Sequence, residues 1–107
     1  MAQQMRSESL PYRTDVRWFH DETVTDATSE PLFIPGGGHD VAVAVVPGTS
    51  ALIEYTLSGY AAINAGTAVW HEWPAGTVSA TTTDVITGSV SALRCVSVGA
   101  TVWQVSA

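Results

Sequence analysis

The residue types that could carry chemistry stand in three short histidine-acid segments. These are His20-Asp21-Glu22, His39-Asp40 and His71-Glu72. Imidazole nitrogens and carboxylate oxygens bind metal ions, and both groups also serve in acid–base catalysis. Neighbouring residues of a β-strand point to opposite faces, however, so a site would need two or three of these segments to converge. No spacing among them is diagnostic of a metal site, and we interpret them as surface imidazoles and carboxylates.

No residue is placed to act as an activated nucleophile. The single cysteine, Cys95, lies in an apolar segment, where a thiol is usually inert core filling, and it has no partner for an internal disulfide. Ser58 and Gly59 form a turn signal rather than the nucleophile elbow of a hydrolase. The glycine run at 36–38 lacks the lysine that follows in a phosphate-binding loop. We therefore expect a protein that is not an enzyme, with no catalytic residues, no metal and no cofactor.

Aromatic residues are the more informative group, because Trp and Tyr provide a large contact area at low entropic cost. The tryptophans are Trp18, Trp70, Trp73 and Trp103, and all fall on predicted strands. We expect about two of them in the core and the others at an interface, with Trp70 or Trp73 the better interface candidates because they face opposite ways. The candidate interface residues are Tyr12, Arg13, Trp18, Phe19, Trp70, Trp73 and Arg94.

Short strands are the elements that must position these residues. Turn signals such as Pro47-Gly48 and Pro74-Ala75-Gly76 recur roughly every ten residues, which is typical of a sandwich or barrel. The sequence predicts an all-β fold, an antiparallel and jelly-roll-like β-sandwich of about eight short strands with no convincing helix. The expected strands are 16–24, 41–46, 51–57, 67–73, 77–82, 84–87, 90–98 and 101–105.

The first residues differ from the rest of the chain. Residues 1–14 are polar and show no periodicity, so we expect an extended, mobile N-terminal arm there. Residues 15–107 are then expected to form a single β-sandwich domain, because a chain of 107 residues is too short for two cores.

Residue alternation predicts sheets that are apolar on both faces. Trp70 and Trp73 fall on opposite faces of one predicted strand, and Leu93 and Val96 do so on another. A two-layer sandwich covers only one face of each sheet, and large exposed apolar patches are uncommon on soluble monomers. We therefore expect a homodimer, a homotrimer or the surface of another protein to cover the second face. The alternative is that the chain's own loops or its N-terminal arm fold over it.

The charge balance argues against two classes of partner. The net charge is −6, and the cations are four arginines, with no lysine. Binding to nucleic acid depends on clustered cations that neutralise phosphates, and binding to an anionic membrane depends on similar clusters. We therefore expect neither nucleic acid nor membrane as a partner. The polar first ten residues show no export signal, which together with the unpaired cysteine fits synthesis in a reducing cytoplasm.

Three segments of the chain carry a resemblance to a known protein type. They are ALIEYTL, AAINAGTAVWHEWPAGTV and TTTDVITGSVSALRCVSVGATVWQVSA, and they cover roughly the C-terminal half. Their turn spacing and tryptophan placement resemble those of small proteins encoded in the structural-gene regions of tailed bacteriophages. The resemblance implies a capsid decoration (cement) protein, a type that is usually a β-sandwich or jelly roll assembled as a dimer or trimer on the virion exterior.

The function expected from this resemblance is structural. The protein would be synthesised in the host cytoplasm, bind the major capsid protein and copies of itself on the outside of the phage head, and stabilise the shell by mass action. An acidic protein suits an outward-facing position away from packaged DNA. Two alternatives remain open. One is a tail-associated or receptor-binding module that uses an exposed tryptophan to bind carbohydrate, and the other is a small hydrolase.

Overall fold

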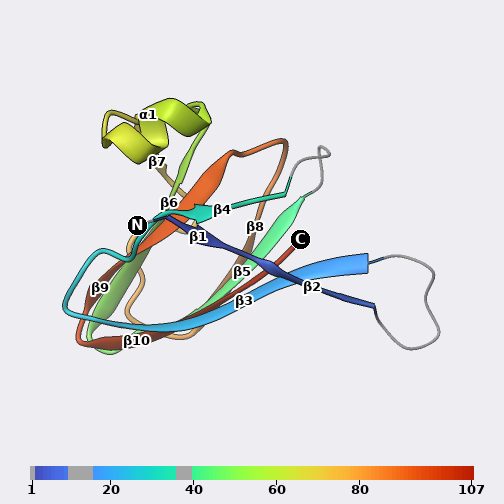
Figure 1. The fold of residues 1–107 in the computed structure, drawn as a ribbon. Helices are drawn as coiled ribbons and strands as arrows, with labels where there is room; N and C mark the ends of the chain where they lie inside the picture. The colour runs from blue at the N-terminus through green and yellow to red at the C-terminus, as the bar shows by residue number, and fades with distance from the viewer. Residues whose placement is uncertain (1, 10–15, 36–39) are drawn as a thin grey trace.

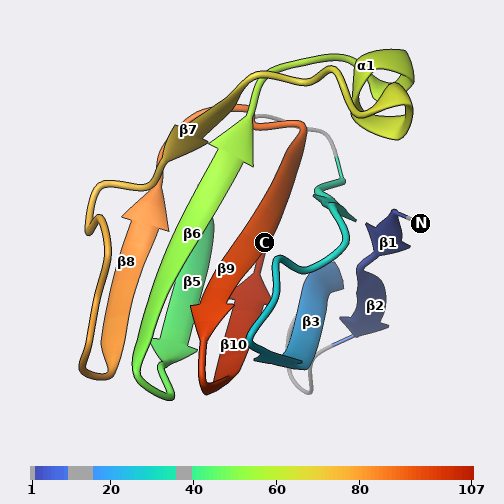
Figure 2. The same ribbon diagram turned by 90° about the vertical axis from the view of Figure 1, so that its left-hand side faces the viewer.

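The computed structural model describes residues 2–9, 16–35 and 40–107. Within these ranges the chain forms ten strands and one short helix, arranged as two five-stranded sheets packed against each other (Figures 1 and 2). The predicted all-β sandwich is therefore confirmed.

Each sheet draws its strands from the whole length of the chain. The first sheet contains, in spatial order, β1 (Gln3–Gln4), β4 (Leu32–Phe33), β9 (Ala92–Val98), β6 (Ser50–Thr56) and β7 (Trp70–Glu72). The second contains β2 (Arg6–Ser9), β3 (Val16–Thr25), β10 (Ala100–Ser106), β5 (Val41–Val46) and β8 (Thr82–Ile86). Helix α1 (Tyr60–Ala65) lies in the connection from β6 to β7. The β1–β4 ladder is parallel, and the other described ladders are antiparallel.

Strands that follow each other in sequence occupy matching positions in the two sheets. The two spatial orders place β1 with β2, β4 with β3, β9 with β10, β6 with β5, and β7 with β8. The pair β9–β10 comes last in the chain but takes the central position. Within the described ranges, no ladder joins β3 or β4 to β5 or β6, so the central pair joins the two halves of the sandwich.

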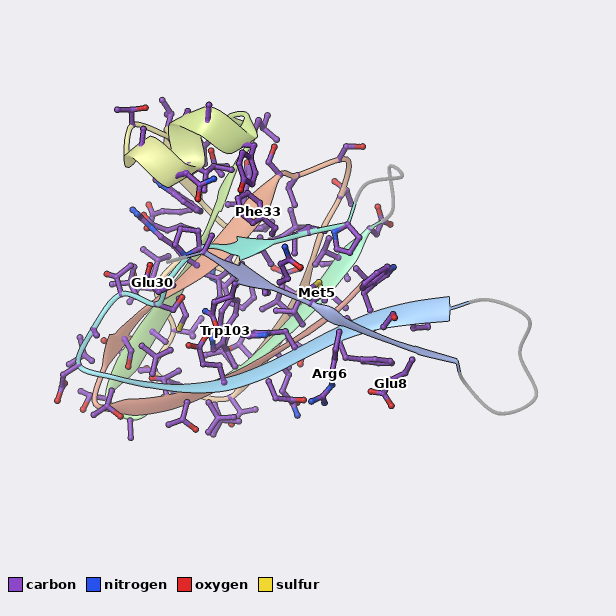
Figure 3. The ribbon with its side chains drawn as sticks, in the orientation of Figure 1. Met5, Arg6, Glu8, Glu30, Phe33 and Trp103 are labelled. Carbon is purple, nitrogen blue, oxygen red and sulfur yellow. The ribbon has the colours of Figure 1, made fainter. Side chains whose placement is uncertain are left out.

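The core follows from strict alternation of apolar side chains. In β5, Val41, Val43 and Val45 are fully buried, while the residues between them face outward. Trp103 of β10 is also fully buried, and Figure 3 shows it between the two sheets. Burying each of these valine side chains contributes about 1.5–3 kcal/mol relative to leaving it exposed. The period of two residues that predicted these strands is therefore also what fills the space between the sheets.

The turns that connect the sheets pack closely side by side. Gly99 has a φ of 81°, and a Cβ atom there would lie 2.8 Å from the Thr49 nitrogen. A Cβ atom on Gly48 would lie 2.5 Å from the Ala100 nitrogen. The carboxylate of Asp26, on the turn after β3, accepts a hydrogen bond of 2.7 Å from the Gly99 N–H. Glycine is therefore needed at both 48 and 99 to let the turns approach.

Residues 2–9 are part of the sandwich. Residues 1–14 were expected to form an extended arm outside the sandwich domain. Of these, residues 2–9 are described, and there β1 pairs with β4 and β2 pairs with β3. Met5, between β1 and β2, is 6% exposed and packs in the core. The polar composition misled because these are short edge strands, and one buried methionine supplies their contact with the interior.

Other differences from the predicted elements are local. Of the predicted strand 77–82, residues 77–81 form no strand, Val78 makes only an isolated bridge to Ala51, and Thr82 is the first residue of β8. Strand β7 is shorter than the predicted 67–73. Helix α1 was not expected. It ends at Gly66, whose φ of 77° is left-handed and whose N–H bonds to carbonyls of the last turn. A glycine in this conformation is a usual helix stop, so the same residue that signalled a turn also ends the helix.

Candidate functional site

The outer face of the first sheet carries a row of side chains below α1. The strand register places Phe33 of β4, Ala92 of β9, Thr56 of β6 and Trp70 of β7 side by side on this face. Ala92 and Thr56 are fully buried although they point away from the core. The chain itself therefore covers this part of the second face.

The end of the sandwich that carries α1 exposes large apolar side chains. Leu57 is 63% exposed, Tyr60 is 71% exposed and Val69 is 63% exposed. Tyr60 stacks on Phe33 with 5.1 Å between ring centroids, and Figure 3 shows Phe33 directly below α1. We call Phe33, Leu57, Tyr60 and Val69 the helix-end surface. Exposed apolar groups that gather in one patch mark interaction sites more often than single exposed residues do.

Hydrogen bonds fix the loops that carry the helix-end surface. The Thr56 hydroxyl donates to the Val69 carbonyl at 2.7 Å and accepts from the Ser58 N–H at 3.0 Å. The Val69 N–H donates to the Ser58 hydroxyl at 3.1 Å. Ile63 of α1 is 5% exposed, so the helix also has a buried anchor. These contacts fix the main chain of the loops that carry Leu57 and Val69.

Trp70 and Arg94, two of the predicted interface residues, contact each other on the outer face of the first sheet. The Arg94 guanidinium lies 4.3 Å from the Trp70 ring centroid. Its Nε donates to Glu54 Oε1 at 2.7 Å. The guanidinium therefore covers one face of the indole, and its charge is already paired. The apolar second face expected here is instead interrupted by an ion pair from the chain itself.

The remaining predicted interface residues do not gather on one surface. Trp73 is 2% exposed and its indole N–H donates to the Gly76 carbonyl, so its choice as an interface residue was wrong. The alternation had placed Trp70 and Trp73 on opposite faces, and the face with Trp73 is the core. Trp18 is half-buried against the core, whereas Phe19 lies on the outer face of the second sheet. Tyr12 and Arg13 lie outside the described residues.

The outer face of the second sheet is a mixed surface with a shallow hollow. Val46, Val85 and Val102 are 40–50% exposed there, among threonine and glutamine side chains. The hollow has a volume of about 280 Å³ and includes the small residues Ala42 and Ala44 in its lining. Ligand pockets usually measure about 300–1,000 Å³ and enclose most of the ligand, so this open hollow is a poor small-molecule site.

A carboxylate and an imidazole meet at the edge where β1 faces β3. His20 Nε2 lies 3.2 Å from Glu22 Oε1, since residues two apart share a strand face. The same oxygen accepts hydrogen bonds of 3.0 Å from the Gln3 amide and from the Trp103 indole N–H. Asp21 points to the opposite face and bonds to Arg6. Glu22 thus links the two sheets, and its Oε1 is fully engaged in doing so.

The other predicted chemical residues are separate from this pair. His71 packs against Tyr55 with the two rings tilted by 36° and 5.5 Å between their centroids, and Glu72 faces the other way. His39 lies outside the described residues. Across residues 2–9, 16–35 and 40–107, no three His, Cys, Asp or Glu side chains gather as a metal site would require.

Cys95 is a core residue, as the sequence predicted. It is fully buried, and this burial, together with the negative charge of Glu22, raises the pKa of its thiol to about 12. The thiol is therefore protonated at neutral pH, which makes it a poor nucleophile.

Comparisons with known proteins complete the description. In the part of the chain that is described, no helix is long and apolar enough to cross a membrane. Comparison with protein-family models, curated proteins and solved structures gave no match for this chain.

Proposed function

We propose that this protein is a structural, non-catalytic virion protein that decorates the outside of a phage head and stabilises the shell. It binds the major capsid protein through the helix-end surface and assembles there with copies of itself. The resemblance of the C-terminal half to phage structural proteins motivates the capsid assignment. The observation that carries the binding role is the exposure of Leu57, Tyr60 and Val69 on one end of an otherwise well-packed sandwich.

The rigid support of the helix-end surface favours a docking role. A helix of six residues is too short to be stable alone, so α1 depends on its anchors. Ile63 is buried, and Tyr60 stacks on Phe33 of β4. A surface that is already ordered loses less conformational entropy on binding, so more of its contact energy appears as affinity.

The charge of the protein fits a position on the outside of the shell. The net charge is −6, and two of the arginines, Arg6 and Arg94, form ion pairs with carboxylates of the same chain. An acidic surface of this kind has few cationic side chains that could neutralise the phosphates of packaged DNA. On the exterior, the protein stabilises the expanded head simply by binding the assembled form and not the dissociated subunits.

The test is a binding assay with expanded heads that lack the protein. The double variant Leu57→Ser with Tyr60→Ser should bind such heads about tenfold or more weakly than wild type in a sedimentation assay. The matched control is Val46→Ser, which removes a similarly exposed apolar side chain from the outer face of the second sheet, where it is not part of the helix-end surface. Electron microscopy of decorated heads should show density on the shell. Absence of that density, or equal binding by the double variant, would contradict the proposal.

A carbohydrate-binding role in a tail-associated module is a second candidate, and it rests on Trp70. This indole is half-buried at the edge of the first sheet, and Glu54 and Glu72 share its face. Carboxylates beside an aromatic ring are groups that sugar hydroxyls and ring faces can contact. Binding on a glycan array that is lost in Trp70→Ala and kept in Trp18→Phe would favour this role. An array with no signal for the wild-type protein would rule against it.

A further inference from the structure

Strand β8 forms one edge of the second sheet. It pairs with β5 on one side, and in the described part of the chain no ladder forms on its other side. An edge strand presents unpaired N–H and C=O groups along its length, and these can pair with a strand from another molecule. Proteins usually prevent this pairing with a specific local feature.

The ladders of the second sheet show which groups of β8 point outward. Trp18 and Ala107 exchange both of their main-chain hydrogen bonds, which sets the pattern at β3 and β10. In antiparallel ladders, alternate residues bond to opposite neighbours, so this pattern extends through β10 and β5 to β8. Asp84 then bonds to β5, while Thr83 and Val85 direct their N–H and C=O groups to the open edge.

The side chain of Asp84 is hydrogen-bonded to one of these outward groups, the N–H of Val85. Its Oδ1 accepts a hydrogen bond of 2.8 Å from the N–H of Val85. This is the N–H that a carbonyl of an added strand would need. Asp84 itself sits on the inward face of β8, opposite Val43. An inward-pointing charge on an edge strand is a feature that natural sheets use against edge-to-edge pairing.

The neighbouring edge of the first sheet is interrupted by its own geometry. Strand β7 has three residues, and after it the chain turns at Trp73 to Gly76, where the Gly76 N–H bonds to the Trp73 carbonyl. The chain rejoins β6 only at the bridge between Val78 and Ala51. Strand β8, by contrast, runs unbroken for five residues, and apart from Asp84 all of them are Thr, Val or Ile. These residue types favour strands, so β8 is well suited to accept another strand.

We propose that Asp84 is an autoinhibitory contact that prevents β8 from pairing with the β8 strand of a second copy. The side-chain acceptor fills the place of the incoming carbonyl. Without this acceptor, the open edges of two β8 strands would pair and join two sandwiches into one continuous sheet. Free molecules are thereby kept from associating edge to edge before they reach a binding surface. This inference concerns a different part of the molecule from the helix-end surface and does not depend on the capsid role.

The test compares three variants by light scattering over a range of concentrations. Asp84→Val removes the acceptor and should double the mass that the wild-type protein shows. Asp84→Asn keeps an oxygen that can accept from the Val85 N–H, and it should keep the wild-type mass. The double variant Asp84→Val with Thr83→Pro should return to the wild-type mass, because proline removes a second outward N–H without removing a bond to β5.

Each outcome decides the proposal, provided that circular dichroism shows all variants folded. An unchanged mass for Asp84→Val would overturn it, because the edge of β8 would then stay unpaired without the Asp84 side chain. Doubling by Asp84→Asn would show that the side-chain acceptor is not the block. Doubling that persists in the proline double variant would place the association elsewhere on the molecule.

Discussion

Replacement of Glu22 by alanine should destabilise the fold by about 2–4 kcal/mol, with most of the loss at Trp103. The indole N–H of Trp103 belongs to a fully buried side chain and has Glu22 Oε1 as its acceptor. Leaving a buried donor without an acceptor costs about 1–3 kcal/mol. Gln3 and His20 also lose their contact with this oxygen, but they reach solvent more easily and should add less.

The assay is equilibrium unfolding in urea, followed by tryptophan fluorescence and circular dichroism. Glu22→Gln retains an acceptor oxygen and should lose about 1 kcal/mol or less. A double-mutant cycle with Trp103→Phe isolates the pair, because phenylalanine lacks the donor, and a coupling energy of about 1–2 kcal/mol is expected. Equal stability of Glu22→Ala and Glu22→Gln would refute the reasoning, as would a coupling energy near zero.

Three further predictions concern the core and its turns. Cys95 should react with thiol reagents at pH 8 only as fast as the protein unfolds, and the free energy of unfolding should fall as pH rises from 9.0 towards about 12, because the unfolded thiol ionises first. Gly99→Ala should cost more than Gly88→Ala in thermal unfolding: both positions have positive φ, but only at 99 would a Cβ atom meet backbone, and equal costs would exclude the close approach. Met5→Ala should destabilise the domain by about 2–3 kcal/mol in urea unfolding, whereas a change below about 0.5 kcal/mol would mean that the N-terminal strands are dispensable.

Alternation within strands made the centre of the fold predictable from sequence. The segment that became β5 reads VAVAVV, and the side chains of Val41, Val43 and Val45 fill the core as a period of two residues requires. The elements that were missed lack such a period. The residues of β1 and β2 are polar because both strands lie at an edge, and a helix of six residues is too short to show a 3.6-residue repeat.

The candidate site was harder to predict, because exposure depends on which face of a strand becomes the core. Alternation correctly separated Trp70 from Trp73, yet nothing local indicated that Trp73 would be the buried one. The cover over Trp70 comes from Arg94, which is distant in sequence. Likewise, Tyr60 became part of the candidate surface only through its contact with Phe33 across the fold. Contacts of this kind follow from strand order, which the turn signals do not specify.

The central position of β9–β10 has a consequence for synthesis on the ribosome. The eight strands that leave the exit tunnel first can form only two separate partial sandwiches, each lacking a neighbour on its inner edge. The nascent chain therefore keeps the inner edges of four strands unpaired, those of β3, β4, β5 and β6, until β9 and β10 arrive between them. Translation that stops before β9 would release a chain with these edges open, and open strand edges favour aggregation and binding by chaperones.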